Sequence, residues 1–273
     1  MVRGLDHLVL AVHDLDAAAY GFEALGFTVG PRNQHSWGTA NRLIQLDGFF
    51  IEILTVAEPD RIPDIHADEF SFGGFNRDFL KRREGPAMLV LESHDPEADR
   101  AAFEHLHLKT YAPFSFERTA TFKDGSTATV GFDLTFVSDP LAPGIGYFTC
   151  RNRYPENFWN SAFQRHENGA KTVVNVVLVA DDPSDHHAFL GGFSGQREMR
   201  ATSLGLELKT PRGTIVVLTP TAFSQLYGVQ NAQRLPDDLP AIAALTIGCS
   251  GLGQTQVLPA ADFFGMTLIL TPL

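Results

Sequence analysis

Two polar residues interrupt otherwise apolar segments, and these residues could carry chemistry. His7 lies within LDHLVLAV, and Glu52 lies within FFIEILTV. An imidazole or a carboxylate that is buried among such side chains needs a polar partner, because desolvating it alone is costly. His7 and Glu52 could therefore pair with each other, or with an arginine such as Arg42, as a buried polar cluster. The alternative is that the two residues form part of a functional site.

Three arginines lie on or at the ends of segments that we expect to be neighbouring strands: Arg42, Arg118 and Arg151. A guanidinium group holds a carboxylate or a phosphate through two hydrogen bonds. Arginines around a concave aromatic site would suit an anionic substrate, and we expect these three to bind it. The alternative is that they pair with the surplus of Asp and Glu.

A polar and aromatic segment, CRNRYPENFWNSAFQRHENGA, separates two strand-rich parts of the chain. Trp159 and its aromatic neighbours either pack this segment onto a sheet or form a wall of a pocket. We expect residues 156–169 to be a connector with few strand features.

An internal repeat positions these residues. GLDHLVLAVHDLD at residues 4–16 matches GPAMLVLESHDPE at residues 85–97 without a gap, and KTVVNVVLVADDPSD at residues 171–185 is a third copy. His7, Met88 and Asn175 fall at the same position of the three copies. The segments IEILTV, IVVLTP and TLILTP form a matching set at the ends of the units.

Each unit begins with a strand-like run, followed by an Asp-rich turn that can cap a helix. The first unit predicts a helix over Leu15–Leu25 and then three strands, which makes βαβββ. The second unit follows the same plan, with a hairpin turn at residues 123–126. The third has a helix near residues 183–190, and the fourth, from about residue 241, keeps a first and a last strand. The predicted fold class is α+β, with three full modules and a degenerate fourth.

A single βαβββ sheet leaves an apolar face bare, so modules must pair into curved mixed sheets, or half-barrels. We expect modules one and two to form residues 1–155, with a cleft between them. Residues 170–273 would hold the third module and the truncated fourth.

Composition excludes several classes of protein. The 273 residues are 44% hydrophobic and carry a formal net charge of −11, so a core is available and general nucleic-acid or anionic-membrane binding is disfavoured. The start of the chain lacks the features of a signal peptide, no stretch is long and apolar enough to span a membrane, and the two cysteines form no disulfide framework. A cytoplasmic protein is expected.

Tandem modules that open with DHLVLAV and end with FFIEIL resemble the vicinal oxygen chelate superfamily of glyoxalases, extradiol dioxygenases, epimerases and resistance proteins. HSWGTANRLIQL, NRYPENFW and FQRHENGA further resemble its glyoxalase-like domain proteins. The resemblance implies that His7 and Glu52 are metal ligands from the first and last strands of module one, with Glu52 also catalytic. Iron, manganese, nickel or zinc would suit these donors.

The resemblance also exposes an incomplete ligand set. Module two offers Met88 and one of Phe148, Thr149 or Cys150, and modules three and four are largely apolar at these positions. A catalytic metal usually takes at least three protein ligands. Four residues could supply the third: Cys150, Asn152, His35 and His166. The resemblance to glyoxalase-like domain proteins also implies that the connector closes over the cleft. Trp159 and His166 would then be residues of the pocket.

Two functions are compatible with these residues. The first is a metal-dependent enzyme for a small, anionic substrate, whose reaction could be of the lyase, isomerase or dioxygenase type. The second is a metal-free protein that binds or sequesters a small molecule, as bleomycin-resistance proteins do. No motif for a nucleotide cofactor is present. Exposed edge strands would also allow a homodimer.

Overall fold

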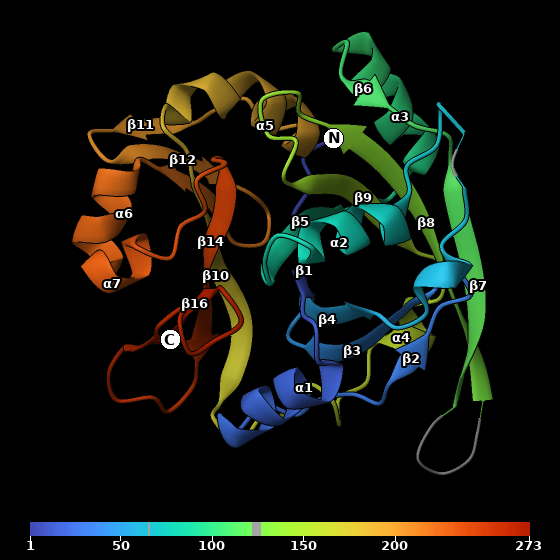
Figure 1. Ribbon diagram of the computed structural model, residues 1–273, viewed down its shortest axis with the longest axis horizontal. Helices are drawn as coiled ribbons and strands as arrows, with labels where there is room; N and C mark the ends of the chain where they lie inside the picture. The colour runs from blue at the N-terminus through green and yellow to red at the C-terminus, as the bar shows by residue number, and fades with distance from the viewer. Residues whose placement is uncertain (65, 122–126) are drawn as a thin grey trace.

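The computed structural model describes residues 1–64, 66–121 and 127–273, and its strands form two curved mixed sheets (Figure 1). The strands of the first sheet are β1 (Leu5–Ala11), β2 (Asn33–Gln34), β3 (Thr39–Gln45), β4 (Phe50–Val56), β5 (Gly85–Glu92), β6 (Lys109–Thr110), β7 (Phe114–Thr121), β8 (Thr127–Ser138) and β9 (Gly146–Asn152). Their order is β2-β3-β4-β1-β5-β9-β8-β6, and β7 pairs with β8.

The second sheet comes from the C-terminal part of the chain. Its strands are β10 (Ala170–Val179), β11 (Arg200–Thr202), β12 (Gly205–Lys209), β13 (Thr214–Leu218), β14 (Ala241–Cys249), β15 (Gln256–Leu258) and β16 (Thr267–Pro272). Their order is β11-β12-β13-β10-β14-β16-β15.

Short helices connect these strands. They are α1 (Leu15–Ala24), η1 (Pro59–Arg61), α2 (Phe72–Leu80), α3 (Pro96–His105), α4 (Pro155–Phe158), η2 (Pro183–His186), α5 (His187–Ser194), α6 (Pro220–Tyr227) and α7 (Val229–Ala232). Asp14 and Asp95 cap α1 and α3 at equivalent places, because the carboxylate of each accepts backbone N–H bonds from the first helical turn.

The pairing of strands confirms the modular fold class. In module one, β1 runs parallel to β4, and in module two, β5 runs parallel to β9. The two modules join where β1 and β5 pair antiparallel. In the second sheet β10 repeats the same relations with β13 and β14, and β14 runs parallel to β16. The division of the chain into domains stays a prediction.

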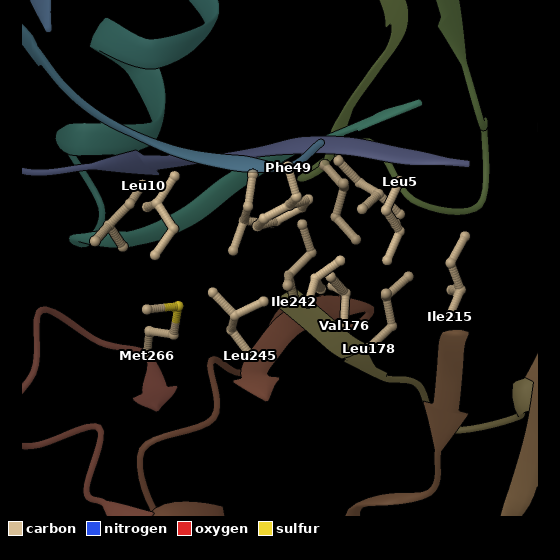
Figure 2. Close-up of a cluster of buried hydrophobic side chains, with 14 of the residues drawn as sticks. Leu5, Leu10, Phe49, Val176, Leu178, Ile215, Ile242, Leu245 and Met266 are labelled. Carbon is tan, nitrogen blue, oxygen red and sulfur yellow. The ribbon is translucent and has the colours of Figure 1, made fainter. Parts of the chain in front are cut away.

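The two sheets pack against each other through one apolar face of each. Figure 2 shows Leu5 and Leu10 of β1, and Phe49 just before β4, facing residues of the second sheet that include Val176 and Leu245. On β1 and β4, alternate residues turn to this shared core, since successive side chains of a strand point to opposite faces. The remaining residues turn to the other face of the first sheet, which we call the site face.

Three features of the fold differ from the expectations. The helices α2, α4, α6 and α7 and the 3-10 turn η1 were not foreseen. Glycines obscure the helical pattern of α2, and α6 starts at a Thr219 cap directly after a strand. The fourth module contains β15 in addition to its first and last strands. The helical part of module three begins with a 3-10 turn, η2, and continues as α5.

The hairpin turn expected at residues 123–126 lies outside the described residues. The strands that flank it pair antiparallel, with Thr121 opposite Thr127.

Across the described residues, no helix has the length and apolar character needed to span a membrane.

A buried ion pair ties the first residues of the chain to both halves of the structure. Arg3 Nη2 lies 2.6 Å from Asp99 Oδ1 on α3, and Arg3 Nη1 donates to the carbonyl oxygen of Phe193 on α5 at 2.9 Å. The side chains of Arg3 and Asp99 are 4% and 7% exposed.

We predict that Asp99→Ala lowers the free energy of unfolding by about 3–5 kcal/mol, because it leaves the Arg3 charge buried without its partner. Urea denaturation measures the change. Glu207→Ala, which removes the partner of exposed Arg200, should cost less than about 1 kcal/mol. Equal losses in the two variants would contradict the structural role of the Arg3–Asp99 pair.

Candidate functional site

A cavity of about 50 Å³, which we call the site cavity, lies on the site face of the first sheet. Strands β1, β3, β4, β7, β8 and β9 contribute most of its wall, and α2 and α4 contribute one phenylalanine each. Its lining residues are His7, His35, Trp37, Asn41, Leu43, Phe50, Glu52, Phe72, Phe116, Arg118, Phe132, Leu134, Phe148, Cys150 and Phe158. Aromatic rings dominate this surface, and few titratable groups reach it.

The alternation of the central strands brings His7 and Glu52 together. Leu8 and Ile51 point into the shared core, so His7 and Glu52 point to the site face. Both are buried, at 3% and 6% exposure, and His7 Nε2 lies 3.8 Å from Glu52 Oε2. The sequence-based expectation that the two residues could pair therefore agrees with their placement.

Each member of this pair has a second polar partner. His7 Nδ1 lies 2.6 Å from Asp6 Oδ2, and Asn41 Nδ2 donates to Glu52 Oε1 at 2.5 Å. A register shift between Leu5 and His7 interrupts the β1 ladder at Asp6. With the Nδ1 proton directed to the Asp6 carboxylate, the lone pair of Nε2 is left for the site cavity.

Burial dominates the electrostatics of Glu52. Desolvation raises the pKa of its carboxyl above the ordinary value, although His7, Asn41 and Arg118 each act to lower that pKa. Glu52 therefore holds a proton more readily than a solvated glutamate does.

Arg118 is the cation of the site cavity. It comes from β7, it is half-buried, and its guanidinium group interacts with the charge of Glu52. Burial lowers the pKa of Arg118, and Glu52 partly opposes this shift. Within the described part of the chain, Arg118 forms no salt bridge, so the guanidinium can accept an anionic ligand.

His35 is a neutral residue at the rim of this network. Its Nδ1 lies 2.8 Å from Thr39 Oγ1, and its ring stacks on Trp37 with 4.6 Å between centroids. Asn41 Nδ2 lies 3.4 Å from His35 Nε2, so one amide links His35 and Glu52. Burial, and secondarily Arg118, lowers the pKa of His35 to about 4.

Two of the predicted substrate-binding arginines, Arg42 and Arg151, lie outside the lining of the site cavity. Arg42 points to the opposite face of β3 from Asn41 and Leu43, and its Nη2 lies 2.8 Å from Asp16 Oδ1 on α1. Arg151 is exposed and does not belong to the lining of the cavity. In both cases the alternation of the strand decides the direction of the side chain.

The connector residues take structural positions. His166 accepts from the backbone N–H of Thr28 at 2.9 Å and donates to the carbonyl oxygen of Gln45 at 2.8 Å, which pins the connector to module one rather than placing this imidazole in the cavity. Trp159 packs edge-on against Phe50 and Phe158, which themselves line the cavity. Trp159 thus supports the wall from behind.

The register identifies the module-two counterparts of the His7–Glu52 pair. His7 lies opposite Phe50, two residues before Glu52, and Met88 lies opposite Gly146, two residues before Phe148. The counterpart of Glu52 is therefore Phe148, whose ring packs against that of His7. Two of the four positions that could hold metal ligands in this sheet therefore carry apolar side chains, Met88 and Phe148.

In the second sheet the equivalent face is filled. The register places Asn175, Val216, Ala244 and Ile269 at the corresponding positions. Phe223 and Ala222 of α6 pack into the same apolar cluster as Ala244 and Ile269. No acidic or imidazole group stands at these four positions.

Of the candidate third ligands, Cys150 and His35 line the site cavity. Donor atoms of Asp6, His7 and Cys150 lie within 4.8 Å of one another. Burial and the nearby carboxylates of Asp6 and Glu52 raise the pKa of the Cys150 thiol well above its usual range, so a bound cation would be needed to favour the thiolate. Asn152 lies at the end of β9, outside the lining.

Sequence reasoning missed Asp6, Asn41 and the phenylalanines of the wall other than Phe158. Asn41 had a recognisable signal, since it is a polar residue within the strand-like run GTANRLIQL. Asp6 had none, because its role depends on the interruption in the β1 register.

The depressed pKa of His35 predicts a specific loss of stability in acid. In the unfolded chain this imidazole titrates near pH 6.5, while in the folded protein it stays neutral to about pH 4. Its contribution is present above pH 6.5 and is lost as the pH falls toward 4, with a limit of about 3 kcal/mol. His35→Gln should remove this part of the acid dependence in urea denaturation series, whereas His94→Gln at an exposed position should not. Identical acid profiles for His35→Gln and the wild type would contradict the prediction.

Comparisons with known proteins agree with this architecture. A family model described as a glyoxalase-like domain matches residues 5–192. A search of the curated proteins finds no match. A hypothetical protein from Staphylococcus aureus has a similar structure over 100% of both chains, with a TM-score of 0.75 and 12% identity.

Two further structures share the fold at low identity. A mutant of 4-hydroxymandelate synthase from Streptomyces coelicolor aligns with 91% of this chain and 71% of its own, with a TM-score of 0.50 and 11% identity. A xylose isomerase-like TIM barrel/4-hydroxyphenylpyruvate dioxygenase fusion protein aligns with 92% of this chain and 37% of its own, with a TM-score of 0.51 and 13% identity. Because the family model covers well over half of the sequence, the chain belongs to the glyoxalase-like domain family.

Proposed function

We propose that this protein is an enzyme that acts on a small anionic substrate in the site cavity. The observation that carries this proposal is the placement of three groups around one small aromatic space. His7 Nε2 and Glu52 Oε2 face each other across 3.8 Å, and Arg118 approaches from β7 without a salt-bridge partner among the described residues. Buried charged groups around a pocket are typical of reacting centres.

The donor set fits a divalent cation with two protein ligands from neighbouring strands, His7 on β1 and Glu52 on β4. Metal-bound imidazoles usually donate their other N–H to a carboxylate, as His7 does to Asp6, and Asn41 orients the carboxylate of Glu52 in the same way. Iron, manganese, nickel or zinc would suit this pair. Among the described residues, the cluster of donor atoms that includes Cys150 contains Asp6 and His7 but not Glu52. Such an ion would act as a Lewis acid toward a carbonyl or enolate oxygen of the substrate.

The residues of the chain have their own roles in such a reaction. Arg118 would hold the acidic group of the substrate and so fix the direction in which the rest of the molecule enters. The rings of Phe50, Phe148 and Phe158 would exclude water, which strengthens the interaction of each charge inside the cavity. Burial raises the pKa of Glu52, so its carboxyl would hold a proton in the metal-free cavity and release that proton when a divalent ion binds.

We predict that protein purified without a chelator or a His-tag, and supplied with manganese, iron, nickel or zinc, binds about one ion per chain. His7→Ala and Glu52→Gln should each lower the affinity for the ion by at least about tenfold, because each removes a ligand. Elemental analysis after gel filtration measures the content.

The exposed pair His94 and Glu97 supplies matched controls, since His94→Ala and Glu97→Gln remove the same chemical groups outside the cavity. These variants should keep the ion. Equal metal content in all four variants, or no uptake by the wild type, would overturn the metal-dependent mechanism.

We also predict that Arg118→Met weakens the binding of a small carboxylate, such as propanoate, by about 10- to 100-fold, since a charge-assisted hydrogen bond contributes about 1.5–3 kcal/mol. Arg151→Met should leave the affinity unchanged, because Arg151 is exposed away from the cavity. NMR titration of the ligand measures both affinities. Equal affinities in the two variants would remove Arg118 from the site.

A second function, metal-free binding of a small molecule, has one observation in its favour. Met88 and Phe148 occupy the module-two positions that correspond to His7 and Glu52, and neither offers a hard donor for a catalytic cation. Retained carboxylate binding in a protein that takes up no metal would favour this second function.

A further inference from the structure

A second cavity adjoins the site cavity. It measures about 70 Å³ and shares three wall residues with the first: Leu43, Arg118 and Phe158. Four side-chain amides line it, and we call it the amide cavity after them: Asn33, Gln45, Asn157 and Asn160. Nothing in the proposed catalytic chemistry uses this space.

The strands make the two cavities one groove. Along β3, Asn41 lines the site cavity, Leu43 lines both cavities, and Gln45 lines the amide cavity. Along β8, Phe132 lines the site cavity and Val130 lines the amide cavity. These residues are two apart on their strands, so they share a face and follow one direction.

Arg118 stands at the junction of this groove. It lies opposite Val130 in the β7–β8 ladder, while Phe116 lies opposite Phe132. The guanidinium group of Arg118 therefore lies where the lining changes from mostly aromatic side chains to mostly amide side chains. No carboxylate belongs to the described lining of the amide cavity, so this compartment suits a neutral polar group.

The amide cavity has a fixed wall with unused hydrogen-bonding atoms. Gln45 accepts from the backbone N–H of Asn160 at 3.0 Å and donates to the carbonyl oxygen of Phe158 at 2.8 Å, which holds α4 and the following residues on β3. Asn157 uses its amide nitrogen to bond Thr129. Among the described residues, the Oδ1 atom of Asn157 and the Nδ2 atom of Asn160 have no partner, which leaves an acceptor and a donor for a ligand.

The size of the site cavity limits what can enter it. At about 10–15 Å³ for each water position, 50 Å³ takes a group of only a few heavy atoms. A larger ligand that reaches His7 and Glu52 must therefore extend beyond the site cavity, and the amide cavity adjoins it at Arg118.

We propose that the ligand is an extended acid, with its acidic group at Arg118 and a neutral, hydrogen-bonding tail in the amide cavity. This inference rests on the proposed anionic site and adds a second compartment that determines which acids bind. The reactive end of the molecule occupies the site cavity, and the tail contacts Asn157 and Asn160.

The test compares propanoate with 6-hydroxyhexanoate in NMR titrations of the full chain. In the wild type the long acid should bind at least about tenfold more tightly than the short acid, through added contacts worth about 1.4 kcal/mol. Asn157→Phe, which fills the amide cavity, should reduce this advantage to about twofold and leave propanoate binding unchanged. Gln230→Phe on exposed α7 is the matched control and should keep the full advantage.

A second variant keeps the test informative if Asn157→Phe does not fold. Asn157→Leu keeps the branched shape and the number of side-chain heavy atoms but removes the acceptor, so it should weaken the binding of 6-hydroxyhexanoate more than that of hexanoate.

The outcomes separate the two proposals. Equal binding of long and short acids, with both weakened by Arg118→Met, would overturn the second compartment and leave the anionic site intact. An advantage of the long acid that survives both Asn157 variants would also overturn it. Binding of both acids that is insensitive to Arg118→Met would overturn the anionic site itself.

Discussion

The alternation of side chains on β1 and β4 is the constraint on which this structure depends. One face of each strand belongs to the core between the two sheets, where Leu8, Leu10 and Ile51 are completely buried. The opposite face carries His7 and Glu52. A shift of one residue in either strand would exchange these faces, and it would bury a charge in the core between the sheets. The stability of the core therefore fixes the geometry of the site.

The same architecture occurs twice in the chain, but one sheet alone keeps an open site face. In the second sheet, α6 packs Ala222 and Phe223 against the face that corresponds to the site face. The second sheet then contributes its other face, with Val176 and Leu245, to the shared core. We interpret this half as a support that holds the strands of the first sheet in place.

The apolar lining of the site cavity strengthens the electrostatic interactions of its few titratable groups. Phenylalanines from six elements surround His7, Glu52 and Arg118, so water screens these charges poorly. Burial consequently shifts the pKa of Glu52 upward and the pKa of His35 downward, each toward its neutral form. Arg118 keeps its charge and meets the ligand at the junction of the two cavities.

The sequence by itself determined the modules, because repeated apolar runs, Asp caps and turn residues act locally, and it singled out His7 and Glu52 as polar residues in apolar strands. It could not distinguish Arg118 from Arg42 and Arg151, since all three lie on or near strands and the direction of a side chain depends on register. The partners Asp6 and Asn41, the structural position of His166 and the groove from Leu43 to Arg118 were likewise decided by tertiary structure. These features arise where strands distant in sequence pair and curve around one space, and no local pattern encodes that pairing.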